Sequence, residues 1–268
     1  MAERFLEVDG VRLRYVERGA GGPPIVLLHG DGSMIEDFAT SGLLERAAER
    51  HRVLAFDRPG YGRSERPRDR AWTPEAQAAL LVAAFARLGI ERPVVVGHSW
   101  GTLVALALAL EHPNAVSGLV LLSGYYYPVP RPAAALAALP AVPVLGDAAR
   151  YTVAPIIGAI LAPGLIAQAF APAPVPPRFI AGFPTGLTLR PEHIRASAED
   201  SGLLMPSAAA FERRYGELRL PVAIVAGAED RIVNTDLQSA RLHREAPGST
   251  LRVVQGEGHM VHHGAAGL

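Results

Sequence analysis

The sequence contains no cysteine and no lysine, and each absence removes a class of chemistry. Without cysteine the chain forms no disulfide, uses no thiolate nucleophile and offers no sulfur ligand to a metal. Without lysine it forms no Schiff base. The formal net charge is zero, because 26 basic residues balance 26 acidic ones. No electrostatic pattern therefore favours nucleic acid as a partner.

A continuous membrane-spanning run is also absent. No charged residue lies between Tyr151 and Pro177, but this stretch is interrupted by Pro155, Gly158, Pro163 and Gly164. Proline and glycine disfavour a long uninterrupted helix, so we expect buried or lid helices here and no stable membrane insertion. Contact of this stretch with a membrane surface stays open as the alternative. The first nine residues carry acidic side chains where a signal peptide has an apolar core, which predicts a cytoplasmic location.

The stretch from Val94 to Gly101, Val-Val-Val-Gly-His-Ser-Trp-Gly, organises the rest of the chain. Three β-branched residues predict a buried strand, and good helix-forming residues continue from Thr102 to Glu111. Ser99 lies at the joint between them. A strand that turns into a helix within one residue brings other backbone close, which explains the small neighbours Gly97 and Gly101. This pattern resembles the nucleophile elbow of the α/β-hydrolase family.

The rest of the chain alternates apolar runs with helical periodicity, which predicts a mostly parallel sheet with helices on both faces. A hairpin is expected around Asp9-Gly10. Thr73-Pro74-Glu75 begins a helix that Gly89 ends. Residues 125–207 are rich in Ala and Pro and show no clear strand. The resemblance places a helical cap there, between core segments 1–124 and 208–268.

A serine hydroxyl needs a base, and the base needs an acid that fixes its tautomer. Gly-Glu-Gly-His at 256–259 and Gly-Ala-Glu-Asp at 227–230 resemble the family's segments after two late strands. They make His259 the base and Asp230 the acid, in the order Ser99, Asp230, His259 that this fold uses. His262, His263 and Glu229 are the alternates, and His29 and His98 are assigned to loop support.

His29-Gly30-Asp31-Gly32 follows the apolar run at 25–28 and resembles the segment that completes the family's oxyanion hole. The resemblance implies backbone N–H donors at Asp31 and Trp100, with the Asp31 side chain pointing away. Asp57 to Ser64 also matches the family, and we interpret it as an architectural loop rather than a second nucleophile site. No metal or organic cofactor is expected.

These features predict a serine hydrolase that cleaves a small hydrophobic ester or lactone through an acyl-enzyme. Carbon–carbon bond hydrolases and cofactor-free perhydrolases use the same triad and stay open, as does a receptor-type member with little turnover. Trp100 is shared with haloalkane dehalogenases and epoxide hydrolases, but those carry aspartate at the nucleophile position. Candidate pocket walls, placed by the family's layout, are Met34, Phe38, Tyr125, Met205 and Val233.

One departure from the family is the short segment after His259. Family members usually continue into a final helix that covers the sheet, whereas this sequence stops at Leu268. We therefore expect lower stability or self-association into a homo-oligomer.

Overall fold

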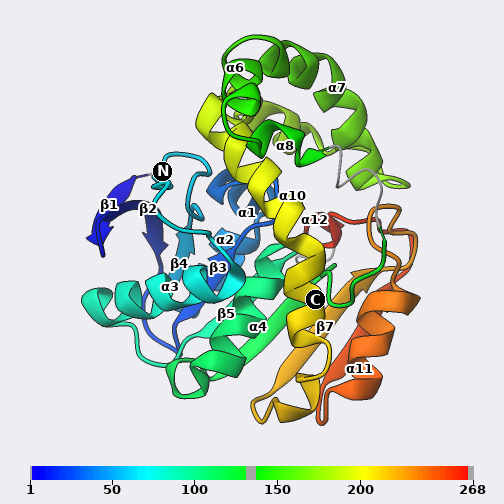
Figure 1. The fold of residues 1–268 in the computed structure, drawn as a ribbon. Coiled ribbons are helices and arrows are strands. Elements are labelled where there is room, and N and C mark those ends of the chain that lie inside the picture. The colour runs from blue at the N-terminus through cyan, green and yellow to red at the C-terminus, as the bar shows by residue number, and fades with distance from the viewer. Residues whose placement is uncertain (1, 131–136, 265–268) are drawn as a thin grey trace.

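The computed structural model describes residues 2–130 and 137–264, and its centre is an eight-stranded sheet in the order β1-β2-β4-β3-β5-β6-β7-β8 (Figure 1). β1 pairs antiparallel with β2, β2 pairs antiparallel with β4, and all later neighbours are parallel. The strands are β1 (Arg4–Val8), β2 (Val11–Arg18), β3 (Ile25–Leu28), β4 (Val53–Phe56), β5 (Val94–His98), β6 (Gly118–Leu122), β7 (Val222–Gly227) and β8 (Thr250–Val254).

Helices cover both faces of this sheet. One face packs against α3 (Pro74–Leu88), α4 (Gly101–Glu111) and α11 (Arg241–Glu245). The other packs against α1 (Ile35–Ser41), α2 (Leu43–Ala48) and α12 (Val261–Gly264). Short 3-10 turns lie at Pro113–Ala115, Leu139–Ala141 and Tyr215–Glu217, and a π-helical turn, η4, at Asp236–Ala240. The predicted fold class is confirmed.

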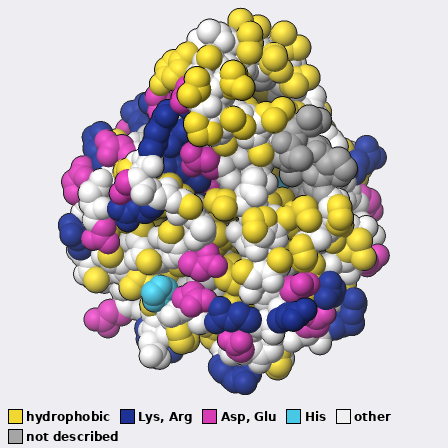
Figure 2. Space-filling view, in the orientation of Figure 1, with side chains coloured by type: hydrophobic (Ala, Val, Ile, Leu, Met, Phe, Trp, Pro, Cys, Tyr) yellow, Lys and Arg dark blue, Asp and Glu magenta, His cyan; other side chains and the backbone are white. Residues whose placement is uncertain are grey.

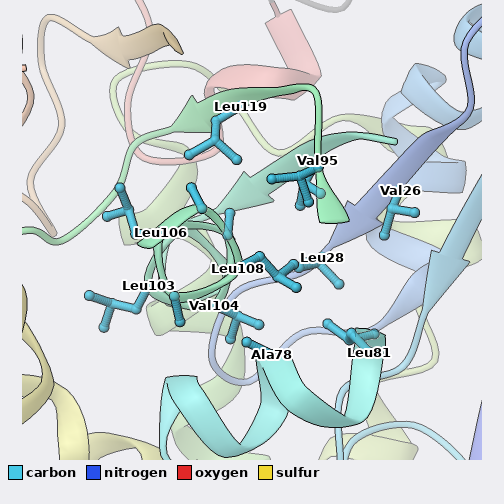
Figure 3. Packing of buried hydrophobic residues seen from close by; sticks show 14 of the residues in the cluster. Val26, Leu28, Ala78, Leu81, Val95, Leu103, Val104, Leu106, Leu108 and Leu119 are labelled. Carbon is cyan, nitrogen blue, oxygen red and sulfur yellow. The ribbon is translucent and has the colours of Figure 1, made fainter. Parts of the chain in front are cut away.

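Apolar side chains point alternately to the two faces of the parallel strands, as buried strands require. Val26 and Leu28 of β3 join the cluster that surrounds α4, whereas Leu27 between them joins the cluster around α1. Figure 3 shows α4 enclosed by side chains of the sheet and of α3. Nine of its residues, from Gly101 to Ala109, are buried, so the helix is apolar on every side. This packing fixes the N-terminal end of α4, where the site lies.

The local predictions made from turn and capping residues are confirmed. Asp9 and Gly10 both have positive φ at the hairpin between β1 and β2. The Thr73 hydroxyl accepts a hydrogen bond from the Ala76 N–H at the start of α3, and Gly89 ends that helix in the left-handed conformation. Because each residue acts on its nearest neighbours, the sequence alone specifies these ends.

Between β6 and β7 the chain forms a helical segment above the carboxyl ends of the strands (Figure 1). Its helices are α6 (Leu145–Tyr151), α7 (Val153–Phe170), α8 (Pro177–Gly182), α9 (Thr185–Thr188) and α10 (Pro191–Phe211). The expected insertion begins at Tyr125, yet Tyr125, Tyr126 and Tyr127 all pack in the main core. Its expected end at residue 207 lies within α10, whose Leu204, Ala208 and Phe211 also pack there.

The uncharged stretch 151–177 was expected to form buried or lid helices, and it forms a helix of the segment above the sheet that is not buried. It contains the whole of α7, in which Phe170 is the one buried residue. The prolines and glycines do not break it, although Pro163 lies inside the helix. Burial depends on what packs against a helix, and composition alone does not supply that information.

Candidate active site

Ser99 lies at the turn between β5 and α4 with a φ of 50°. This left-handed conformation is costly for a residue other than glycine, and it is maintained by packed backbone on both sides. A Cβ on Gly97 would lie 2.6 Å from the Gly101 carbonyl oxygen, and a Cβ on Gly101 would lie 2.3 Å from the Leu28 carbonyl oxygen. The explanation of both glycines as sites of close backbone approach is therefore confirmed.

The structure brings Ser99, His259 and Asp230 together from three strand ends. His259 Nε2 lies 2.9 Å from the Ser99 Oγ, and His259 Nδ1 lies 2.8 Å from an Asp230 carboxylate oxygen. Because a carboxylate only accepts, Nδ1 carries the proton and Nε2 presents its lone pair to the hydroxyl. This distance is within the range required for general-base proton transfer.

Asp230 is oriented by the backbone that follows it. Its Oδ1 accepts hydrogen bonds of 2.8 Å from the N–H groups of Ile232 and Val233, and its Oδ2 faces His259. The side chain is 1% exposed. The carboxylate therefore has little freedom to rotate, and it fixes both the tautomer and the direction of the imidazole ring.

The two backbone donors expected from the sequence, at Asp31 and Trp100, are free to bind another group. Among the described residues, neither the N–H of Asp31 nor that of Trp100 has an acceptor in the protein. Trp100 precedes the first residue of α4, so its amide is at the positive end of the helix dipole. Unpaired N–H groups at such a position are suited to a developing negative charge.

The Asp31 side chain points away from Ser99, toward Tyr61 and α10. Its Oδ1 lies 2.9 Å from the Tyr61 hydroxyl oxygen, which also lies 2.8 Å from an Asp200 oxygen. The phenol has one hydrogen for these two carboxylates, and the Ser201 hydroxyl donates to the other oxygen of Asp31 at 3.2 Å. Burial and the Asp200 carboxylate both raise the pKa of Asp31, in agreement with this arrangement.

Arg58 connects the loop at residues 29–32, which carries Asp31, to α10. The sequence analysis did not single it out. Its guanidinium donates to the carbonyl oxygens of His29 and Gly30 and forms a 2.7 Å ion pair with Asp200. Asp200 also pairs with Arg66 at 3.0 Å, and all three side chains are almost completely buried. Asp57 and Arg58 are in a segment that the sequence marks as architectural, but nothing in it identifies a partner 142 residues away.

His29 and His98 support loops, as expected. His29 accepts a 2.9 Å bond from the Arg58 N–H, and His98 lies 3.1 Å from the carbonyl oxygen of His259. Burial, with smaller contributions from neighbouring imidazoles, lowers the pKa of His98 well below its ordinary value. The neutral ring therefore donates from Nε2 to the backbone of the catalytic loop.

The alternates for the base and the acid have other partners. His262 and His263 lie 3.1 and 2.7 Å from the same oxygen of Asp37, and Ser33 donates to its other oxygen. Of the described residues, Asp37, His262 and His263 form the group whose types could also bind a metal. Their direct hydrogen bonds satisfy the buried carboxylate, so the group braces α1 against α12. Glu229 instead accepts from the Gly256 N–H.

The candidate pocket residues do not line one cavity. Tyr125 and Val233 line a cavity of about 260 Å³ next to Asp230. Met34 and Phe38 do not line this cavity and are fully buried in two separate hydrophobic clusters. Met205 is half-buried on α10. A larger cavity of about 690 Å³ is lined by residues such as Arg63, Arg190 and His193 and includes none of the three triad residues.

This fold and this arrangement define a class. A family model described as alpha/beta hydrolase fold matches residues 23–266, and the chain belongs to that family. One relative is the dihydrolipoyllysine-residue acetyltransferase component of the acetoin cleaving system of Cupriavidus necator. It is 40% identical over 123 residues, which cover 46% of this chain and 32% of that protein.

A second relative is named as a hydrolase, and one similar solved structure is described as a lactone-degrading enzyme. A 2-hydroxymuconate semialdehyde hydrolase of a Pseudomonas species is 36% identical over 129 residues, covering 47% of this chain and 45% of that protein. The chain thus spans less than half the length of these curated relatives. A solved structure described as Est816, an N-acyl homoserine lactone degrading enzyme, is 27% identical, covers 96% of this chain and 94% of its own, and superposes with a TM-score of 0.67.

Proposed function

We propose that this protein is a serine hydrolase that cleaves a small hydrophobic ester or lactone through an acyl-enzyme intermediate. The observation that carries the proposal is the 2.9 Å contact between His259 Nε2 and the Ser99 Oγ, with Asp230 behind the ring. A serine hydroxyl is a weak nucleophile until an oriented base accepts its proton. The likeness to a lactone-degrading enzyme over nearly the whole chain supports the same class of substrate.

In the first half-reaction Ser99 Oγ attacks the acyl carbon while His259 accepts its proton. The carbonyl oxygen becomes an oxyanion that receives hydrogen bonds from the N–H groups of Asp31 and Trp100. His259 then donates the proton to the leaving alkoxide, the carbon–oxygen bond breaks, and the acyl group stays on Ser99. In a lactone the alcohol remains attached to the same molecule.

Water completes the cycle by the reverse sequence. His259 removes a proton from the water, the hydroxide oxygen bonds to the acyl carbon, and the same two N–H groups stabilise the second oxyanion. Collapse returns the proton to Ser99 and releases the acid. The Asp31 carboxyl faces Tyr61 and Ser201, so the group beside the oxyanion is its backbone N–H and not its side chain.

A small cavity lies beside Asp230, and neither Ser99 nor His259 lines it. Its volume of about 260 Å³ is just below the range of roughly 300–1,000 Å³ that is typical of drug-sized ligands. Tyr125, Val129, Ile232 and Val233 supply apolar walls, whereas Asn234 and Gln238 supply polar groups. Arg231 and Asp230 line the cavity too, so charged and apolar groups share its walls.

A panel of p-nitrophenyl esters and lactones of increasing chain length tests the proposal. Wild type is expected to hydrolyse short members fastest, and Ser99→Ala to lose activity by at least about 10³-fold. Ser117 lies just before β6, at the edge of the sheet away from Ser99. Ser117→Ala is the matched control and is expected to retain activity. 2-Hydroxymuconate semialdehyde, the compound in the Pseudomonas relative's name, belongs in the same panel. Equal ester hydrolysis by wild type and Ser99→Ala would show the mechanism to be wrong.

A further inference from the structure

Helix α7 presents an apolar surface to solvent. Its eighteen residues contain no charged side chain, and its mean hydropathy is 1.9. The helix α4 is similarly apolar but is enclosed by the core, whereas 6% of α7 is buried. Large aliphatic side chains on α7 are half to three-quarters exposed: Val153, Ile156, Ile157, Ile160, Leu161 and Leu165.

The apolar surface continues onto the neighbouring turn and α6. Leu139, Val144, Leu145 and Tyr151 are each more than half exposed. Figure 2 shows hydrophobic side chains gathered at the end of the molecule that α6 and α7 form in Figure 1. We call this surface the cap patch. Contiguous exposed apolar surfaces of this kind mark sites of protein or membrane interaction rather than ordinary solvent-facing surface.

We propose that the cap patch binds the surface of a lipid membrane. Its chemistry favours lipid over a second protein, because protein interfaces are rimmed with polar groups and carry roughly ten hydrogen bonds. Along α7 and in the rest of the cap patch, the side chains with a hydrogen-bonding group are Gln168 and Tyr151. A lipid surface requires no such partners in its acyl region.

The small part of α7 that contacts the protein also favours lipid as the partner. Ala154, Gly158, Ala162 and Ile166 are half-buried and recur every four residues, so one narrow stripe faces the protein. Pro155 and Ala169 are half-buried and Phe170 is buried as well, and the other positions are exposed and, apart from Gln168, carry no polar side chain. A second copy of this chain would cover one further stripe, whereas acyl chains can cover the whole outward surface.

The helix is attached to the body of the protein, so the contact is interfacial rather than spanning. The Met260 N–H donates to the Ala169 carbonyl at 3.3 Å, and Phe170 packs against Phe179 and His263. Although α7 is long and apolar enough to cross a membrane, these contacts tie its end to the loop that carries His259. A helix attached in this way lies in the boundary between headgroups and acyl chains.

Charge contributes little to the proposed contact. No basic residue lies between Tyr151 and Pro177, and the guanidinium of the next one, Arg178, donates to the carbonyl oxygens of Ser41 and His263. Attraction to anionic lipid requires several basic residues near the surface. The cap patch therefore binds zwitterionic lipid, and added salt does not release it.

Flotation of the Ser99→Ala protein with phosphatidylcholine vesicles tests the inference without any lipid cleavage by Ser99. The protein is expected to rise with the vesicles equally in 0.1 M and 1 M salt. Ile156→Ser/Ile160→Ser should lower the partition coefficient by at least about tenfold, because two large apolar side chains no longer enter the lipid. The matched control is Leu237→Ser/Val253→Ser, which changes two exposed aliphatic residues outside the cap patch. It is expected to stay within twofold of the parent.

Thermal unfolding of both double variants checks that they fold, and sedimentation velocity without vesicles reports their oligomeric state. The inference is overturned if the parent protein stays at the bottom of the gradient, or if both double variants float equally. It is also overturned if the parent is a dimer that Ile156→Ser/Ile160→Ser dissociates and neither protein floats, since the cap patch then binds a second copy. The assay measures no catalysis, so its outcome is independent of the proposed hydrolase activity.

Discussion

Replacing Asp200 by asparagine tests the buried network that joins α10 to the loop at residues 29–32. Asp200 accepts hydrogen bonds from Arg58 at 2.7 Å, Tyr61 at 2.8 Å and Arg66 at 3.0 Å, and its side chain is completely buried. Asparagine has the same shape but no negative charge. Arg66 keeps its pair with Glu199, whereas Arg58 retains only neutral acceptors among the described residues.

The expected cost follows from leaving a buried guanidinium without its counterion. Removing one partner of a buried ion pair typically costs about 3–5 kcal/mol. Since a domain has about 5–15 kcal/mol of stability in total, Asp200→Asn should still fold but with much of that margin lost. For a domain of this size the loss corresponds to a fall in Tm of roughly 6–20 °C.

Urea unfolding at pH 7 measures this cost. Glu192→Gln is the control, since it makes the same change of carboxylate to amide on α10 in an exposed pair with Arg190. Exposed pairs contribute about 0–1 kcal/mol, so this variant should resemble wild type. A loss below 1 kcal/mol for Asp200→Asn, no larger than that of Glu192→Gln, would refute the assignment of a buried, charged network.

Three other substitutions give expected outcomes that follow from single contacts. Asp230→Asn should lower kcat by roughly 10⁴-fold in ester hydrolysis, because an amide no longer fixes the tautomer of the catalytic base; a fall below tenfold would contradict this. Gly101→Ala should destabilise by about 1–3 kcal/mol in urea, since its Cβ meets the backbone at 2.3 Å, whereas Gly186→Ala meets nothing within 4 Å and should not destabilise. Burial, followed by Arg58, lowers the pKa of His193 to about 3, so the unfolded chain binds its proton first and stability falls as the pH drops below 6.5. Between pH 7 and pH 5 His193→Phe should therefore lose about 2 kcal/mol less unfolding free energy than wild type, and equal losses would contradict the shift.

Local features of the site were predictable because each depends on nearby residues. Gly97, Ser99 and Gly101 specify a tight strand-to-helix turn through backbone sterics that any chain with this spacing shares. Asp230 and His259 follow apolar strands and loop residues, so their placement at neighbouring strand ends follows from the parallel topology. The structure brings these three residues together as expected.

Features that depend on distant segments were not predictable. The Arg58–Asp200 pair joins positions 142 residues apart, and a charged residue in a loop does not reveal its partner. Tyr125 to Tyr127 begin the segment that lacks strands, yet they pack in the core, where Tyr127 contacts Tyr215 and Gln238 binds the N–H groups of Tyr126 and Tyr127. Whether α7 is buried depends on neighbouring helices, and its composition is equally compatible with either result.

Mass spectrometry of the protein after reaction with a fluorophosphonate tests the role of Ser99 most directly. The account predicts one phosphonyl adduct, on the peptide that contains Ser99, with much slower labelling of His259→Gln and no adduct on Ser99→Ala. An adduct on another residue such as Ser64, with the peptide of Ser99 unmodified and esterase activity abolished, would contradict it.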